Sequence, residues 1–499
     1  MKDDTAGRNI AVIGAGFSGL AASAVLAESG ANVQVFEKNP ELGGRARTFQ
    51  HSGFTFDMGP SWYWMPDVFE RYYRRFGYTT SDFYDLVQLD PGFRMIFGED
   101  DYWDIPADFE AICELFEQTE RGGADNLRRF IADAKYKYEV GVNNLVYKPA
   151  HSIFEFASVS LALDVVRLQL FSSFRSLIRR YFSHPRLLSL LEFPVLFLGA
   201  MPEKTPALYS LMNYAGLRQG TWYPMGGFGK VVGAFEAIAR SRGVEIFTSE
   251  SVVSLDIARA SIARVHTTLR AVQASAVVGS ADYHHIEQQL LPKEYRSYSA
   301  EYWAKKTFAP SCLIYYIGTN RKIGRLQHHN LFFDSDLEQH SKEIYHTKKW
   351  PENPLFYVCC PTKTDPTVAP VGSENIFVLI PVAAGLNDSG NEKEEYLQII
   401  LNRLERFTHE NIRDSMVVCE SYSVSDFVAD YNACKGNAYG LANTLMQTAV
   451  LRPGIHSRKV RNLFFAGQLT VPGPGVPPSI ISGQVSAGEV LKYLHKQRQ

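Results

Sequence analysis

Residues 10–19 read IAVIGAGFSG, and this stretch decides the fold. The apolar run 10–13 is typical of a buried parallel strand, and a helix-forming stretch from Leu20 to Ser29 follows the glycines. A second apolar strand over 33–36 ends at Glu37. Strand, glycine turn, helix, strand and acid together make the dinucleotide-binding fingerprint in its full context. The sequence therefore predicts an α/β, Rossmann-like nucleotide-binding domain near the N-terminus.

Each residue of this fingerprint has a mechanical reason to be there. Gly14 permits the tight turn, Gly16 lets the backbone approach a pyrophosphate, and Gly19 lets the helix pack close to the strand. The helix N-terminus offers unpaired N–H groups and a positive dipole end to the phosphates. Glu37 is placed to accept hydrogen bonds from the adenosine ribose.

Two glycine-containing segments follow Glu37, ELGGRART over 41–48 and FDMGPS over 56–61. They resemble the second glycine motif and the next element of the large flavoprotein family that includes amine oxidases and carotenoid desaturases. The resemblance implies FAD as the cofactor, with the backbone of Gly43 and Gly44 close to it and Arg45 as a fixed cation for its pyrophosphate. It also places the turn Gly59-Pro60-Ser61 near the flavin.

The middle of the chain returns to the cofactor. The glycine turn 224–230 precedes a predicted helix over 231–242, and a strand over 244–247 follows. In the family, the next strand touches the adenine through its backbone, here at Val252 or Val253. We therefore expect a discontinuous FAD-binding domain. Its predicted segments are 1–95, 225–285 and 455–499, and an inserted α+β substrate domain takes 96–224 and 286–454.

The C-terminal stretch 462–483 is the most specific segment of the chain. A strand ends in Ala466-Gly467, and prolines at 477 and 478 favour the start of a helix there. We expect Pro477, Ser479 and Ile480 to lie at the flavin, with N–H groups near the helix start facing its pyrimidine carbonyl. Gln468 stands where many relatives place an acid against the ribityl chain, and its amide can still form hydrogen bonds there.

Segments 202–226, 431–441 and 447–453, together with the C-terminal stretch, resemble bacterial-type carotenoid (phytoene) desaturases. The resemblance covers essentially the whole chain. It implies FAD-dependent desaturation of a carotenoid such as phytoene, with hydride passing to the flavin and a proton to an unidentified acceptor. A polyene cis–trans isomerase, a later-pathway carotenoid desaturase, oxidase or saturase, and a prenyl-binding module of the Rab-escort type are the alternatives. The intact cofactor motifs disfavour the last of these.

Composition narrows the partners and the possible sites. A formal net charge of −2 gives no basic excess for nucleic acid. The six cysteines form no C-x-x-C pair, and no metal site is predicted. The adjacent pairs His284-His285 and His328-His329 are interpreted as structural or exposed, so no catalytic residue is assigned. Oxygen or a quinone is a possible electron acceptor.

The segment 153–200 is a candidate for membrane contact. Leu163, Val166, Leu170, Phe174, Leu177 and Tyr181 fall on one helical stripe, with arginines on the opposite side. No stretch reaches the ~18 apolar residues that span a bilayer, and no signal peptide is expected. We therefore expect a cytoplasmic protein that associates peripherally with the membrane, where a long apolar polyene would be collected.

Overall fold

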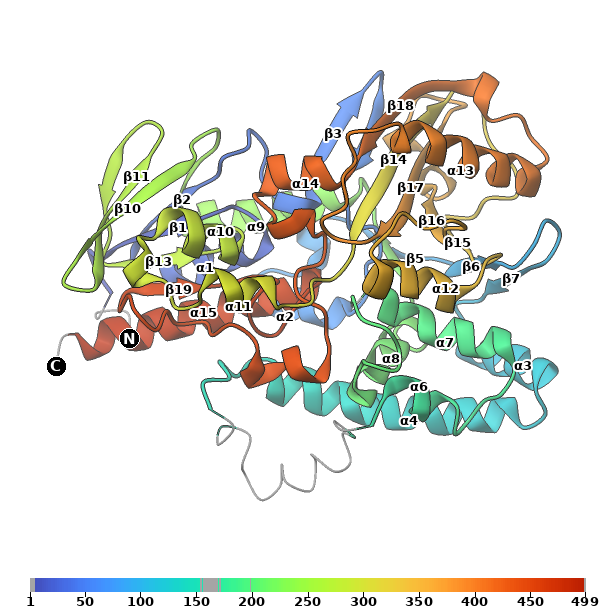
Figure 1. Cartoon of the computed structure of the whole chain (residues 1–499), viewed down its shortest axis with the longest axis horizontal. Coiled ribbons are helices and arrows are strands. Elements are labelled where there is room, and N and C mark those ends of the chain that lie inside the picture. The colour runs from blue at the N-terminus through green and yellow to red at the C-terminus, as the bar shows by residue number, and fades with distance from the viewer. Residues whose placement is uncertain (1–4, 153–154, 156–168, 170–171, 198, 498–499) are drawn as a thin grey trace.

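The computed structural model describes residues 5–152, 155, 169, 172–197 and 199–497 (Figure 1). Two sheets organise this part of the chain. A five-stranded parallel sheet lies on the left of Figure 1, and a seven-stranded mixed sheet lies at the upper right. Helices fill the lower right, beneath the larger sheet. This arrangement confirms the predicted fold class, a Rossmann-like domain joined to an α+β region.

The five-stranded sheet assembles from distant segments. Its strand order is β19-β13-β1-β2-β9, and all its neighbours are parallel. The strands are β1 (Asn9–Ile13), β2 (Asn32–Phe36), β9 (Glu245–Phe247), β13 (Ala276–Gly279) and β19 (Leu463–Phe465). Strands β1, β2, β9 and β19 fall where the sequence predicts a strand. Because their carboxyl ends lie along one edge, the turns that follow β1, β2 and β13 gather there.

Three helices cover this sheet: α1 (Phe17–Glu28), α9 (Phe228–Ser241) and α15 (Val476–Lys496). Small residues let α15 approach α1 closely. A Cβ built at Gly483 would lie 2.2 Å from the Ser18 carbonyl oxygen, so only glycine fits there. This contact ties the C-terminal helix to the first one, far away in the sequence.

Smaller elements surround this core. A three-stranded antiparallel sheet contains β10 (Val252–Ala258), β11 (Ser261–Thr267) and β12 (Ala271–Gln273). One two-stranded antiparallel sheet pairs β3 (Thr48–His51) with β4 (Phe54–Asp57), and another pairs β5 (Leu86–Gln88) with the distant β8 (Trp222–Pro224). Short helices in the connections are α2 (Pro66–Arg75), α10 (Tyr283–His285), α11 (Ala300–Ala304), α12 (Leu337–Lys342) and α14 (Val424–Tyr431).

The seven-stranded sheet has the order β18-β14-β17-β16-β15-β6-β7. Its strands are β6 (Phe93–Ile96), β7 (Tyr102–Ile105), β14 (Ser311–Thr319), β15 (His329–Phe332), β16 (Phe356–Cys359), β17 (Glu374–Val382) and β18 (Met416–Tyr422). The predicted domain boundary at residue 95 falls within β6, although the domain division as a whole stays a prediction. Central β14 and β17 are buried almost throughout, so both faces of the sheet are covered.

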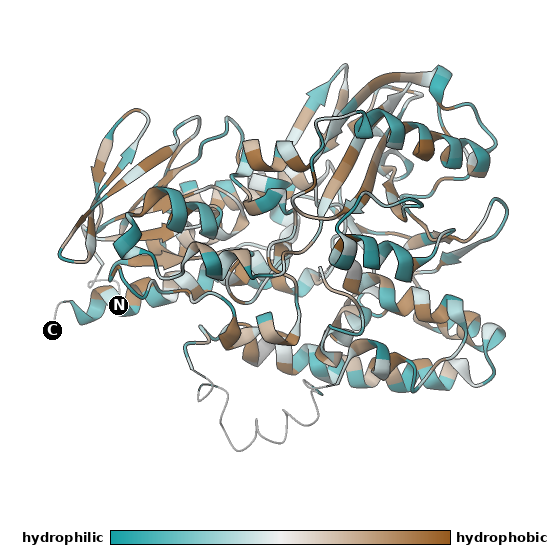
Figure 2. Cartoon of the chain, in the orientation of Figure 1, coloured by the Kyte–Doolittle hydropathy of each residue, from teal (hydrophilic) through white to brown (hydrophobic). Residues whose placement is uncertain are grey.

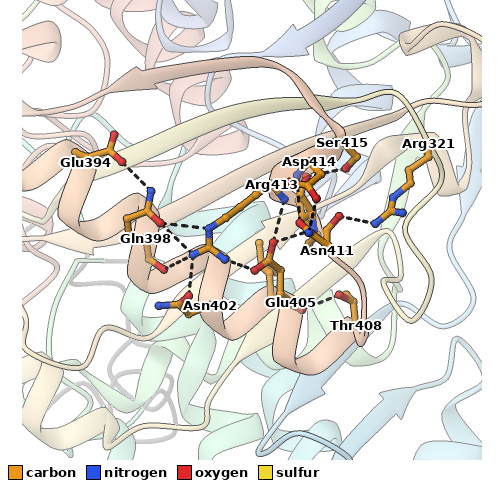
Figure 3. Close-up of polar contacts among 12 residues, drawn as sticks. Arg321, Glu394, Gln398, Asn402, Glu405, Thr408, Asn411, Arg413, Asp414 and Ser415 are labelled. Atoms are coloured by element: carbon orange, nitrogen blue, oxygen red, sulfur yellow. Dashed lines mark hydrogen bonds and ion pairs between the residues drawn. The ribbon is translucent and has the colours of Figure 1, made fainter.

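Helix α13 (Glu392–Thr408) covers one face of this sheet through Ile400, Leu401 and Leu404. Figure 2 shows its outward side as hydrophilic, as expected for an amphipathic surface helix. Beyond the helix, Arg413 reaches back to the side chains of Gln398, Asn402 and Glu405 (Figure 3). These contacts fix the loop that enters β18.

The other face packs on a helical region made of α3 (Phe109–Thr119), α4 (Gly123–Val140), α6 (Phe174–Ile178), α7 (Pro185–Phe197) and α8 (Leu211–Leu217). Two members of the predicted membrane stripe, Phe174 and Leu177, are 0% and 1% exposed within this core. They therefore do not face a membrane. Leu163, Val166 and Leu170 lie outside the described residues. Among the described helices, none is both long and apolar enough to cross a membrane.

Candidate active site

One large cavity, about 480 Å³ in volume, runs along the carboxyl edge of the parallel sheet and continues under the seven-stranded sheet. Fourteen of the predicted cofactor residues line it. They are Gly14, Gly16, Glu37, Gly43, Gly44, Arg45, Gly59, Pro60, Ser61, Val252, Gly467, Gln468, Pro477 and Ser479. The fold therefore brings together residues that are up to 465 positions apart (479 − 14).

The three fingerprint glycines have three different surroundings. Gly14 has φ +98°, and a Cβ there would lie 2.9 Å from the Ala281 nitrogen. A Cβ on Gly19 would lie 2.0 Å from the Gly14 carbonyl oxygen, so Gly19 serves helix packing and is not among the described cavity-lining residues. A Cβ on Gly16 would meet nothing within 4 Å, because it would project into the cavity. A side chain at Gly16 would therefore clash with a ligand in the cavity and not with other residues of the protein.

Glu37 is buried and held in place at the end of β2. Its carboxylate accepts hydrogen bonds from the Ala15 N–H at 2.8 Å and from the Asn39 N–H and side-chain amide, both at 3.0 Å. These bonds fix one charge at the nucleotide end of the cavity while lone pairs remain for hydroxyl donors. This is the geometry expected for a ribose-binding acid.

Arg45 supplies a buried cation in the cavity wall. One Nη donates to the Asn437 carbonyl oxygen at 3.2 Å, while the buried Nε has no hydrogen-bond partner among the described residues. Burial lowers the pKa of Arg45, and the nearby Asp282 carboxylate partly offsets that effect. A buried guanidinium with an unused donor is costly unless an anion completes it. The site therefore fits a pyrophosphate.

The flavin side of the cavity is formed by tight turns. A Cβ on Gly59 would lie 2.6 Å from the Arg45 carbonyl oxygen, which explains the glycine at this crossing. The Gln468 amide lies within hydrogen-bonding distance of Arg45 and Asn437, beside Gly467. Together, these contacts place an amide and a guanidinium side by side in the wall.

The start of α15 differs in one detail from the expectation. The Ser479 N–H donates to the Gly475 carbonyl oxygen at 3.0 Å, so the prediction that it is available to a cofactor carbonyl is wrong. Pro477 and Pro478 have no N–H, and Ile480 is fully buried away from the lining. The positive end of the α15 dipole faces the cavity here, where Val476 lines it.

Val252 and Val253, the two residues predicted to contact the adenine, lie on opposite faces of β10. Val252 is 6% exposed and lines the cavity. Val253 is 50% exposed and lies outside the described lining, because successive side chains on β10 point to opposite faces. Of the two, only Val252 is among the described lining residues of the cavity.

Away from the nucleotide end, the cavity becomes apolar and aromatic. Its lining there includes Trp62, Trp64, Met65, Val142, Leu145 and Leu208. The carboxylates of the described lining, Glu37, Asp282 and Asp430, all come from segments at the nucleotide end. Such a chamber suits a long hydrocarbon beside a charged cofactor.

The sequence did not predict the polar group behind this apolar wall. His329 on β15 pairs directly with Cys359 on β16. A ring nitrogen of His328, a ring nitrogen of His329 and the sulfur of Cys359 lie within 4.8 Å of one another. Both histidines are buried. The Tyr357 hydroxyl contacts His329 and lines the cavity as well. Residue spacing carried no signal for this arrangement, since strand pairing creates it.

Comparison with known proteins gives the family. The model of flavin-containing amine oxidoreductases matches residues 17–491, nearly the whole chain. The chain belongs to this family. The cofactor of this flavoprotein is FAD, and the buried Arg45 and the open space at Gly16 fit its pyrophosphate.

Relatives of this flavoprotein include several carotenoid desaturases. It is 38% identical to a carotenoid 3,4-desaturase of Haloarcula japonica over 98% of this chain and 99% of that protein. It is 30% identical to a zeta-carotene-forming phytoene desaturase of Myxococcus xanthus over 100% of this chain and 96% of that protein. It is 31% identical to a 4,4'-diapophytoene desaturase of Staphylococcus haemolyticus over 97% of this chain and 98% of that protein. These identities place the flavoprotein among the carotenoid desaturases, as the resemblance predicted.

Solved structures share the fold at low identity. A putrescine oxidase bound to putrescine superposes with a TM-score of 0.61 at 15% identity, covering 97% of this chain and 99% of the other. A conjugated-linoleic-acid-producing fatty acid isomerase from P. acnes gives 0.60 at 13%, covering 99% of both chains. These likenesses support the fold of this flavoprotein and say nothing about its substrate.

Proposed function

We propose that this protein is an FAD-dependent desaturase of an acyclic carotenoid such as phytoene. The observation that carries the proposal is the single cavity, whose charged end has the fingerprint, Glu37 and Arg45 and whose other end is apolar and aromatic. Full-length relatedness to carotenoid desaturases supports the same substrate class. We assign the fourteen lining residues named above to cofactor binding, with Gly19 acting through helix packing.

The reaction removes two hydrogens from adjacent carbons of the hydrocarbon. Bound FAD supplies the two-electron oxidation by accepting a hydride. The chain's own residues bind and align: Trp62 and Trp64 flank the hydrocarbon, and Arg45 and the α15 dipole hold negative charge at the cofactor. The apolar walls exclude water from the reacting carbons. Oxygen or a quinone is the proposed final electron acceptor.

The decisive experiment is expression in a pigment-free bacterium that accumulates phytoene, followed by chromatography of the extracts. We expect a product with a longer conjugated system, and none from a Gly16→Val variant that cannot hold FAD. Unchanged phytoene with folded, FAD-loaded protein would refute phytoene as the substrate. A product that differs from phytoene only in double-bond geometry would favour the isomerase.

A later carotenoid intermediate is the second candidate substrate. The relative of 38% identity is named a carotenoid 3,4-desaturase, whereas the phytoene and diapophytoene desaturases reported above are 30–31% identical. The same strain can be supplied with the enzymes that extend phytoene to a red polyene. Further desaturation of that polyene, with phytoene untouched, would select this candidate.

We also propose that the protein docks on the cytoplasmic face of a membrane to collect its substrate. Leu445, Met446 and Leu451 are 37%, 71% and 44% exposed in two adjacent short turns, which gives a compact apolar surface. Met446→Glu with Leu451→Glu should reduce co-sedimentation with liposomes and leave FAD content unchanged. Equal sedimentation of this variant and the wild type would exclude these turns as the contact.

A further inference from the structure

A chain of hydrogen bonds leads from the apolar cavity into the seven-stranded sheet. The Ser61 Oγ and the Tyr357 Oη are 2.8 Å apart, and the Tyr357 Oη lies 2.6 Å from the His329 Nδ1. Ser61 and Tyr357 both line the cavity, while His329 is 0% exposed behind it. Two hydroxyls thus connect the space for the hydrocarbon with a buried imidazole.

The surroundings of this imidazole are apolar and aromatic. The Trp62 ring stacks on the His329 ring with centroids 4.2 Å apart and an interplanar angle of 9°. The His328 ring lies 4.6 Å away, and Cys359 is the cross-strand partner. The His329 Nε2 is buried and has no hydrogen-bond partner among the described residues. Burial and His328 hold the pKa of His329 well below its ordinary value, and Asp365 is the carboxylate that acts on His328.

We propose that Tyr357 and His329 form the proton acceptor of the desaturation, with Ser61 positioning the tyrosine. This inference rests on the proposed function and deepens it. Tyr357 is the group that touches the substrate. Among the described residues on the apolar side of the cavity, it is the tyrosine hydrogen-bonded to an imidazole, whereas the Tyr439 hydroxyl faces the Cys312 thiol.

The atoms and electrons balance over two successive steps, hydride loss and then proton loss. With FAD bound, one carbon would give up a hydride to the cofactor, and the adjacent carbon would then lose a proton as its C–H electron pair forms the new double bond. That proton goes to the Tyr357 oxygen while the Tyr357 O–H proton passes to the His329 Nδ1. After the product has left, the proton returns along the same hydroxyls and passes, with the hydride equivalent held by the cofactor, to the final electron acceptor, oxygen or a quinone.

A weak base suffices for this step. A carbon next to a cationic centre is a very strong acid, so a neutral imidazole of lowered pKa can still accept its proton. The resting neutral ring avoids placing a charge beside a hydrocarbon. When the imidazolium forms, the stacked face of Trp62 stabilises it. The carboxylates Glu37, Asp282 and Asp430 lie at the nucleotide end, away from the reacting carbons.

The first test uses Tyr357→Phe and His329→Gln with phytoene in liposomes. We expect turnover to fall roughly 100-fold in both, in the range for loss of general-base catalysis, with FAD content and phytoene affinity kept. Tyr315→Phe is the matched control, since it removes another buried tyrosine hydroxyl in the same sheet that bonds the Lys393 carbonyl oxygen. Turnover of Tyr357→Phe and His329→Gln equal to that of the control would overturn the proposal.

An isotope experiment separates catalysis from structural damage. Phytoene is deuterated on one or the other of the two adjacent carbons. In Tyr357→Phe the isotope effect should appear at the carbon that loses the proton, because that step has become slow. An isotope effect that stays confined to the hydride-donating carbon in this variant would overturn the relay.

A third test needs no substrate, so its failure is distinguishable from failure of the proposed function. The relay requires that the His329 Nδ1 accept the Tyr357 hydrogen bond, so the ring proton must reside on Nε2. Nitrogen NMR of the histidine-labelled holoenzyme, with His329→Gln to assign the signal, reads the tautomer directly. A proton on Nδ1 would refute the proposal.

Discussion

Gly16→Val is the perturbation that most directly tests the cofactor site. Gly16 has φ −76° and ψ 178°, which any residue adopts, and its Cβ direction is open to the cavity. Valine should therefore fold without backbone strain. Its methyl groups would occupy the space in front of the first turn of α1. The first N–H group of this helix to form a backbone hydrogen bond within it is that of Leu20, which donates to the Gly16 carbonyl oxygen at 3.0 Å. The N–H groups before Leu20 can therefore bind the phosphates.

The size of the effect follows from the bonds lost. Each hydrogen bond to a charged phosphate contributes about 1.5–3 kcal/mol. Excluding the pyrophosphate from two N–H groups should cost about 3–6 kcal/mol, or roughly 10²–10⁴-fold in FAD affinity. The free energy of unfolding of the apoprotein should hardly change, because no protein atom lies within 4 Å of the new Cβ.

The assay is titration of apoprotein with FAD, followed by flavin fluorescence, alongside thermal unfolding of the same sample. Gly233→Val is the control, because Gly233 is exposed on α9 and a Cβ there also meets nothing within 4 Å. We expect the control to bind FAD like the wild type. Wild-type affinity in Gly16→Val would refute the placement of the pyrophosphate, and an unfolded variant would refute the argument that the site is open.

Three other changes have defined outcomes. Glu37→Gln should weaken FAD binding about 10-fold by removing a charged acceptor, and unchanged affinity in the same titration would count against a ribose contact. The Glu405 carboxylate accepts hydrogen bonds from the Ile412 and Arg413 N–H groups, both at 2.9 Å, and Glu405→Ala removes these bonds. It should therefore cost about 2 kcal/mol of unfolding free energy by calorimetry, with FAD affinity intact. Burial lowers the pKa of His340 to about 4. As pH falls from 6.5 towards 4, His340 is therefore protonated in the unfolded state but still neutral in the folded state. The free energy of unfolding should drop by up to about 3 kcal/mol over this range. In His340→Gln, melting curves should lose part of that slope, and an unaltered slope would exclude His340 as its source.

The nucleotide end could be predicted because its signals are local. Gly14, Gly16 and Glu37 lie on one strand–turn–helix–strand unit, so spacing along the chain fixes spacing in space. The prolines after Gly475 likewise predicted the start of α15 within a residue or two, since proline favours the first turn. Such features need no knowledge of the rest of the fold.

Other features depended on pairings that no local pattern encodes. The Arg45 side chain meets the carbonyl of Asn437, 392 positions away, and Tyr357 meets Ser61, 296 positions away. The apolar stripe containing Phe174 and Leu177 was interpreted as possible membrane contact because a helical wheel cannot tell a core from a bilayer. Burial by other helices decided the outcome for these two residues.

The same distinction explains why the proposed proton acceptor was invisible in the sequence. The parallel sheet provides the cofactor site from the ends of its strands, where glycines and acids leave a recognisable spacing. The seven-stranded sheet provides Tyr357 and His329 from two adjacent buried strands, where a hydroxyl and an imidazole look like ordinary core residues. Hydride and proton leave adjacent carbons, so their acceptors must both reach neighbouring atoms of the hydrocarbon chain. In the proposed mechanism each sheet supplies one of them, and the cavity between the sheets is where the two half-sites meet.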